Sequence, residues 1–338
     1  MRDFDYKLIA KQVIDEEIIG LLNTIYEYKG KHDFLIDNYS EKIETYIESA
    51  KILYFNSLIK GWSPRGIIEW VNGRHLSVDE EVYAELWVGL RLALKGKDLT
   101  CLKVERFSEI FSYKETFLGF NNLFRNDKNF SCYVGEEYVT YSYVPVEKKF
   151  KNDYLNKTEN EFKRAFFDEK INPLILVSLY LFDIYHIYPW NDGEILFFVL
   201  NFLVSCGFQS VKYASILTLL KEQYASFIKS FECSSVDWET GKNDYKPFVK
   251  FLLNLMIELY EEIDMKIIPL CTCSKISKAD KVTHSILTYN RDFTKSEIRL
   301  LCPDVSESTV ENILVRLTEE KKIYQKGSGR GSYYSFER

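Results

Sequence analysis

Several features of secreted, membrane and metal-binding proteins are missing from this sequence. No stretch of the 338 residues is an uninterrupted apolar run of membrane-spanning length, and Met1 to Tyr6 form no apolar signal segment. The seven cysteines are an odd number without framework spacing, and Cys271 and Cys273 lack the further ligands of a zinc site. These absences predict a soluble protein of the reducing cytoplasm.

The chain also lacks an excess of positive charge. Its 44 Lys and Arg against 50 Asp and Glu give a net charge of -6 and a pI near 5.5, which argues against bulk affinity for nucleic acid or a membrane surface. What the chain does have is 46% hydrophobic and 16% aromatic residues, enough for a sizeable core. A length of 338 residues predicts two or three domains.

Two apolar runs flank a short polar segment beyond the middle of the chain. The first run extends from Pro173 to Tyr185 and ends at His186, and the second continues to Val204. The segment between them is rich in Pro, Asn, Asp and Gly, which tolerate turn dihedrals, so we predict helix, tight loop and helix. Because neither run has a clear polar face, both helices are expected to be largely buried.

On this prediction His186 lies at the lip of the loop, beside a helix N-terminus whose free N–H groups can hold an anion. A histidine there can act as a general base toward a hydroxyl. A single histidine in an apolar context is more often a hydrogen-bonded core residue. The residues alone leave both interpretations open.

The stretch from His186 to Glu194, read without gaps, resembles the signature of the Fic (Fido) proteins, H-x-F-x-[D/E]-G-N-G-R-x-x-R. The resemblance implies transfer of AMP from ATP, with Mg²⁺, onto a Ser, Thr or Tyr hydroxyl of a target protein. It also implies that His186 deprotonates the acceptor hydroxyl. The implied phosphate-binding positions are Asn191, Asp192, Gly193 and Glu194.

The signature is degenerate where the family binds metal and phosphate. Trp190 stands in place of the metal-binding acid, so the displaced Asp192 is the candidate metal ligand. Glu194 and Phe197 stand in place of the two arginines. The carboxylate of Glu194 repels a triphosphate, which an arginine would bind. The alternative is therefore a catalytically inactive Fic-fold regulator that binds protein or DNA.

Upstream, residues 1–100 are predicted to be helical, because apolar residues recur at helical spacing from Tyr6 to about Lys60. The segment from Asn56 to Gly61 resembles the family segment S-S-x-I-E-G, whose glutamate blocks the nucleotide site. Lys60 stands in the place of that glutamate. We hypothesise that Lys60 approaches Glu194 as a regulatory pair of exchanged sign; otherwise Lys60 is a solvated lysine at a helix end.

Residues 130–145 differ in texture from their surroundings. Apolar and polar residues alternate along this segment, which is rich in aromatic and β-branched residues and contains a central Gly135. This pattern predicts a β-hairpin. Its place before His186 resembles the family's flap, whose strand edge aligns a target peptide by main-chain pairing. The alternative is a hairpin that only covers the helical core. The candidate docking residues are Tyr138, Val139, Thr140 and Tyr141.

The order of elements resembles the family over roughly residues 40 to 265. We assign residues 101–268 to a Fic core, with the flap at 130–145 and the motif at 186–197. The predicted fold class is mainly α: a helical Fic core with a hairpin flap, followed by a winged helix domain. Many relatives dimerise, so the resemblance also implies a homodimer, although no stretch of the sequence shows an interface.

Residues 275–338 predict a winged helix-turn-helix, an appendage common in Fic proteins. A helix from Lys281 to Tyr289 is followed by a capping box at Thr294 and another at Ser308, each opening a helix. Two short strands near residues 323–324 and 333–336 then form the wing.

This tail carries twelve Lys and Arg against nine Asp and Glu, a charge of +3 that permits DNA contact. Several glutamates on the third helix weaken the DNA interpretation, and winged helices also dock proteins or dimerise. The candidate DNA contacts are bases for Ser308, Thr309 and Asn312, and phosphates for Lys326 and Arg330.

Overall fold

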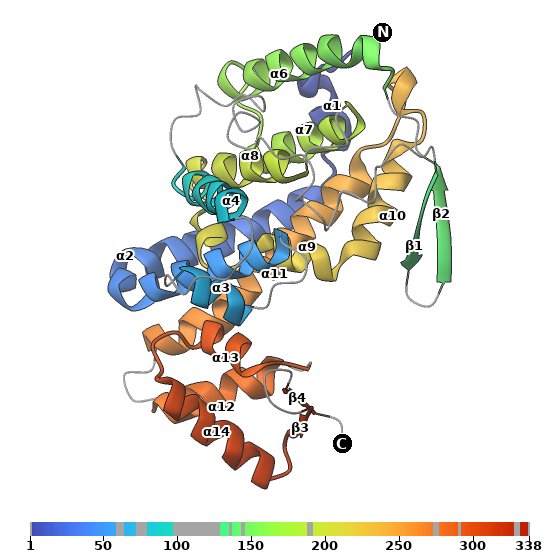
Figure 1. Ribbon diagram of the computed structural model, residues 1–338. Coiled ribbons are helices and arrows are strands. Elements are labelled where there is room, and N and C mark those ends of the chain that lie inside the picture. The colour runs from blue at the N-terminus through green and yellow to red at the C-terminus, as the bar shows by residue number, and fades with distance from the viewer. Residues whose placement is uncertain are drawn as a thin grey trace.

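The chain is mainly helical in a computed structural model (Figure 1). The structure describes residues 2–58, 64–71, 80–96, 129–134, 137–142, 146–187, 192–272, 277–289, 292–327 and 332–336; in parts of these ranges, including both hairpin strands and residues 192–195, only the backbone is described. In these ranges no helix is both long and apolar enough to cross a membrane.

The body of the protein is built from helices between Tyr6 and Thr272. They are α1 (Tyr6–Val13), α2 (Glu16–Leu58), α3 (Pro64–Val71), α4 (Glu80–Ala93), α6 (Lys151–Phe167), α7 (Pro173–Ile187), α8 (Asp192–Ser205), α9 (Ile216–Glu222), α10 (Tyr224–Ser235) and α11 (Lys246–Thr272). Single turns of 3₁₀ helix lie at Lys148–Phe150, Gln209–Lys212 and Trp238–Thr240.

The predicted helical region at the start of the chain contains two helices ahead of α3. The break between α1 and α2 falls at Asp15, whose carboxylate accepts the Ile18 N–H at 3.0 Å and so satisfies a free donor of the first turn of α2. Ile18 and Ile25 of α2 are buried, and α2 packs along α11. α1 packs against α6 and α7 instead.

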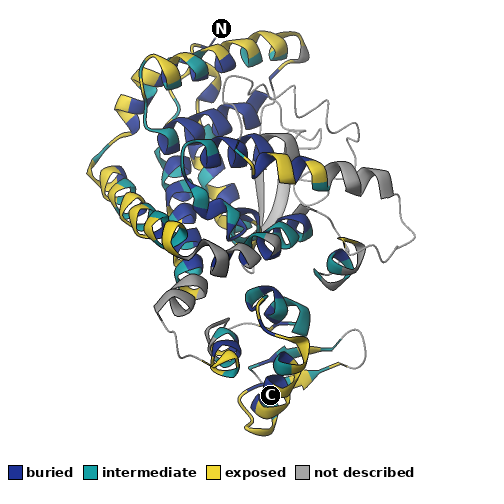
Figure 2. Ribbon diagram, turned by 90° about the vertical axis from the view of Figure 1, so that its left-hand side faces the viewer, coloured by how far each residue is buried: buried dark blue, intermediate teal, exposed yellow. Residues whose placement is uncertain are grey.

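The centre of the molecule is α7, which is buried from Leu174 to Ile187 (Figure 2). α1, α6, α8 and α11 pack around it. This burial confirms the expectation drawn from the lack of a polar face on its apolar run. The rings of Phe162, Tyr180, Phe198 and Phe202 join α6, α7 and α8, with centroids of Phe162 and Tyr180 only 4.5 Å apart. A single apolar cluster runs from Phe4 to Ile263.

The predicted hairpin is confirmed. Strands β1 (Asn129–Val134) and β2 (Glu137–Ser142) pair antiparallel, with Val134 opposite Glu137 next to the connection and Asn129 opposite Ser142 at the far end. β1 lies near α10, and β2 lies on the outer side of the hairpin, away from the helical body (Figure 1).

Three helices and a two-stranded ribbon follow residue 277. They are α12 (Lys278–Tyr289), α13 (Lys295–Leu301), α14 (Glu307–Glu319), β3 (Tyr324–Lys326) and β4 (Tyr333–Ser335). The backbone of Phe293 adds a bridge to Tyr334 beside the ribbon, with N–O distances of 2.8 and 2.9 Å. Side chains such as Val282, Ile298 and Leu314 form an apolar cluster of their own. α13 contacts α2 and α3 of the body.

The helix starts in this part are set by side-chain caps. Thr294 forms the predicted capping box with Glu297. The second predicted start was wrong by two residues: the N-cap is Ser306, whose hydroxyl accepts the Thr309 N–H at 3.3 Å, and Ser308 lies inside the first turn of α14. Both serines are followed by residues that suit a first helical turn, but only Ser306 makes the capping bond.

Candidate functional site

His186 lies on the last turn of α7, one residue before the helix ends, and the residue is 3% exposed. Its ring stacks on Trp238 with centroids 4.4 Å apart and planes 8° apart. The ring of Phe231 lies 4.9 Å away at 22°. The sequence analysis expected this residue at the lip of a loop; in the structure the imidazole is enclosed by aromatic rings.

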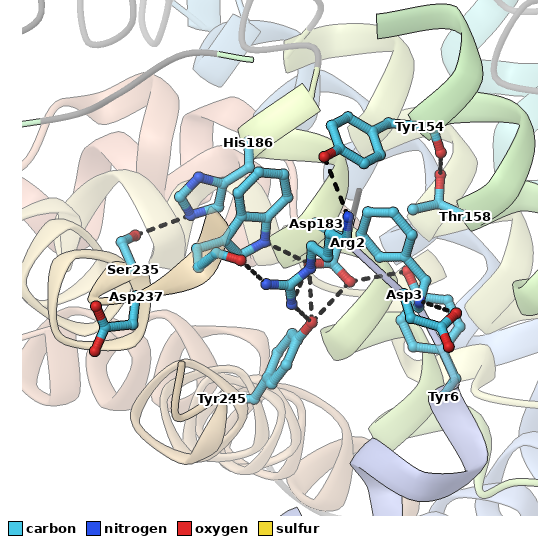
Figure 3. A network of polar contacts seen from close by, with 12 residues as sticks. Arg2, Asp3, Tyr6, Tyr154, Thr158, Asp183, His186, Ser235, Asp237 and Tyr245 are labelled. Carbon is cyan, nitrogen blue, oxygen red and sulfur yellow. Dashed lines mark hydrogen bonds and ion pairs between the residues drawn. The ribbon is translucent and has the colours of Figure 1, made fainter. Parts of the chain in front are cut away.

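The hydrogen bond of His186 fixes which atom carries its proton. Ser235 Oγ lies 2.6 Å from the Phe231 carbonyl oxygen, to which it must donate, because a carbonyl offers no hydrogen. The same hydroxyl lies 3.0 Å from His186 Nε2 and therefore accepts the Nε2–H (Figure 3). The imidazole is thus a donor at Nε2, and the lone pair that a general base needs lies on Nδ1, which is a buried atom.

Burial, and after it the positive charge of Arg2, hold the pKa of His186 well below the ordinary value of 6.5. The ring is therefore neutral at pH 7. A neutral imidazole suits a general base in its charge state, but burial of this one separates it from any acceptor in bulk solution.

A second polar group on α7, Asp183, is fully buried one turn before His186. Its carboxylate accepts Trp238 Nε1–H at 2.7 Å, the Tyr245 hydroxyl at 3.0 Å and the Tyr6 hydroxyl at 3.1 Å (Figure 3). Arg2 Nη2 lies 3.5 Å from the same carboxylate. The network joins the start of the chain to α1, α7 and the start of α11.

Burial raises the pKa of Asp183 above its ordinary 3.8, although Arg2 and the three hydrogen bonds act in the opposite direction. Burial also raises the pKa of Tyr6 and of Tyr245 well above 10.0, with the Asp183 charge adding to the effect. Both phenols are therefore donors at neutral pH. Sequence reasoning missed this network; the available signal was a carboxylate in an apolar run, which requires a partner when buried.

The start of α8 is the place where the family resemblance puts phosphate and metal. Leu196, Phe197 and Val199 all point into the core, and Phe197 is fully buried. The side chains of Asp192 and Glu194 lie outside the described residues, as does Asn191, while the backbone of Gly193 belongs to α8. The described side chains of α8 offer no cation to a triphosphate.

Other predicted site residues are placed only in part. Lys60 and Arg330 lie outside the described residues, so the pair of Lys60 and Glu194 is not visible. Tyr138, Val139, Thr140 and Tyr141 lie on β2, the outer strand of the hairpin. Across the described part of the chain, no three His, Cys, Asp or Glu side chains gather in a way that fits a metal ion.

The candidate DNA contacts on α14 sit among carboxylates. Ser308 and Asn312 are exposed, and between them in sequence lies Glu311, which binds Lys295 Nζ at 2.6 Å. Glu307 pairs with Lys295 at 3.0 Å and with Arg299 at 3.1 Å. Lys295 and Arg299 of α13 are therefore paired with carboxylates of α14, the helix that is expected to contact DNA bases.

A comparison with solved structures agrees with this architecture. No family model matches the chain, and no curated protein matches it. A crystal structure of a Fic family protein from Desulfovibrio desulfuricans G20 superposes with a TM-score of 0.51, over 95% of this chain and 96% of that chain, at 14% identity. The fold is Fic-like. The predicted fold class, mainly helical with a hairpin, is thereby confirmed, whereas the low identity carries no information about activity.

Proposed function

We propose that this chain is a Fic-fold protein that acts by binding another protein and transfers no nucleotide. The observation that carries the proposal is His186, which stands in place of the family base when the signature is aligned from this residue. Its imidazole is buried, stacked between Trp238 and Phe231, and donates Nε2–H to Ser235. A side chain in this setting packs in the core and does not act as a base toward a substrate hydroxyl.

The apolar face of α8 supports the same proposal. When the signature is aligned from His186, the family's second arginine falls on Phe197, which is fully buried. The signature can also be aligned two residues later, with Tyr188 in the histidine's place and Asp192-Gly193 at the acid and glycine. The arginine positions then fall on Leu196 and Val199, which are buried as well. Neither alignment supplies the positive charge that phosphoryl-type transfer needs.

Two parts of the molecule are suited to binding. The hairpin has an outer strand, β2, whose edge can pair with an extended segment of a partner by β-augmentation. The elements after residue 277 have an apolar cluster of their own, which supports a separate winged helix-turn-helix unit at 275–338. The boundary between 1–100 and 101–268 stays a prediction, because one apolar cluster spans both. We propose that this unit docks protein, and that DNA is the less favourable ligand, because Glu307 and Glu311 neutralise Lys295 and Arg299.

The competing function is transfer of AMP from ATP with Mg²⁺ to a protein hydroxyl, which the Fic-like fold alone favours. Calorimetric titration with ATP, GTP and CDP-choline, each with Mg²⁺ or Mn²⁺, separates the two proposals. We expect no saturable heat at millimolar nucleotide. Saturable binding of any of these donors, weakened in an Asp192→Ala variant, would overturn the proposal.

A further inference from the structure

The guanidinium of Arg2 is buried in a pocket with acceptors at its two terminal nitrogens and aromatic rings near it, while Nε is buried without an acceptor. The Arg2 side chain is 1% exposed. It donates to the Trp238 carbonyl oxygen and to the Tyr245 hydroxyl, and the Asp183 carboxylate lies 3.5 Å from Nη2 (Figure 3). The Arg2 Cζ atom lies 4.6 Å from the Trp238 ring centroid, 5.6 Å from that of Tyr245 and 5.3 Å from that of Phe4.

The pocket is held together by bonds that do not involve Arg2. Asp183 is fixed by Trp238 Nε1–H, and the hydroxyls of Tyr6 and Tyr245 complete its shell. These three donors come from three separate parts of the chain and orient one buried carboxylate toward the place of the cation. Removal of the Arg2 side chain therefore leaves the acceptors and the aromatic faces in place, with a buried negative charge that lacks its cation.

The chemistry of the pocket selects a guanidinium over an ammonium ion. A guanidinium is planar, donates along several edges at once and stacks on aromatic rings, whereas an ammonium is a compact and strongly hydrated point charge. Here the acceptors lie at the edges of the guanidinium and the rings of Trp238 and Tyr245 lie near it.

Arg2 reaches this pocket on a short segment without helical structure. Residues 2–5 precede α1, and the exposed Asp3 separates two buried side chains, Arg2 and Phe4. Phe4 packs edge-on against Tyr154 with centroids 5.6 Å apart. The Arg2 backbone N–H donates to the Tyr154 hydroxyl at 3.3 Å. The segment thus binds the body through alternate side chains, as an extended peptide binds a receptor.

We propose that Asp183, Trp238 and Tyr245 form an arginine-recognition pocket that the chain fills with its own Arg2 and that takes an alkylguanidinium when the Arg2 side chain is absent. This site differs from the proposed protein-binding surfaces, and its test involves neither nucleotide nor partner. Because His186 also stacks on Trp238, the filled pocket holds the ring that covers His186.

The test uses the full chain with Arg2→Ala and the probe N-ethylguanidinium at millimolar concentration. We expect Arg2→Ala to lower the thermal midpoint by about 5 °C, and N-ethylguanidinium to restore part of that loss in a saturable manner. Ethylammonium at equal concentration should restore nothing. If Arg2→Ala is recovered unfolded, its refolding yield with and without each probe replaces the midpoint as the readout.

Two controls make the outcome specific. In Arg2→Ala combined with Asp183→Asn the carboxylate is gone, and N-ethylguanidinium should stabilise no further. Arg316→Ala removes an exposed arginine that pairs with Glu320 at 3.8 Å, and neither probe should change its midpoint. The proposal is overturned if Arg2→Ala shows no saturable rescue, if ethylammonium rescues equally, or if rescue persists in the double variant.

Discussion

His186 is expected to make the stability of the protein depend on pH, and His186→Gln tests this. The glutamine amide can still donate to Ser235 but does not titrate. In the wild type, burial and the nearby charge of Arg2 keep the folded-state pKa of His186 well below 6.5. The unfolded chain protonates this histidine near its ordinary pKa, so acid favours unfolding.

The sign and size of the effect follow from this shift. The contribution of the neutral, buried His186 is complete above about pH 6.5 and is lost as the pH falls toward the folded-state pKa. The loss amounts to about 1.4 kcal/mol for each pH unit below 6.5. Between pH 7.5 and pH 5 the wild type should therefore lose more unfolding free energy than His186→Gln, by at most about 2 kcal/mol.

Urea unfolding of both proteins at intervals from pH 7.5 to pH 5 measures this difference, because Asp183 and the other titrating groups are common to the pair. His32→Gln is the matched control. Burial lowers the pKa of His32 too, but Asp264, 2.6 Å from its Nε2, acts in the opposite direction, so its effect should be smaller. A difference between wild type and His186→Gln that stays constant with pH would mean that the folded-state imidazole titrates normally, and the burial argument would fail.

Three other changes test the core, a helix cap and the surface of α14. Phe162→Ala should cost about 3–5 kcal/mol of unfolding free energy by urea titration, and a cost under about 1 kcal/mol would contradict the aromatic packing. Thr294→Ala removes the capping-box hydroxyl and should lower the stability of α12 to α14 by about 1 kcal/mol, measured by amide hydrogen exchange; unchanged exchange would refute the cap. Glu307→Gln with Glu311→Gln should release Lys295 and raise the low-salt affinity for duplex DNA about tenfold by fluorescence anisotropy, whereas unchanged affinity would refute neutralisation of that surface.

The elements that local sequence specifies could be predicted. The apolar runs around His186 gave α7 and α8, and the alternating residues 130–145 gave the hairpin, because side-chain periodicity reports directly on burial. Thr294 and Glu297 predicted a capping box three residues apart. The start of α14 was misplaced because Ser306 and Ser308 offer similar caps, and only the tertiary position of the helix decides between them.

The surroundings of His186 could not be predicted, because its stacking partners Phe231 and Trp238 lie far along the chain. The pairing of Arg2 with Asp183 joins even more distant segments, and no periodic pattern encodes it. Asp183 within an apolar run did signal a buried network, but not the identity of its partners. The sequence thus indicated where a site would be sought, whereas the contacts between distant segments determine what His186 can do.

The most direct test of the central claim is intact-mass spectrometry of the protein and of a cell lysate after incubation with ATP, GTP, UTP or CDP-choline and Mg²⁺ or Mn²⁺, beside His186→Ala. If His186 is a core residue and α8 presents no phosphate clamp, no donor should add mass to the chain or to any lysate protein. The addition of one donor fragment, present with the wild type and absent with His186→Ala, would contradict the account and establish a transferase.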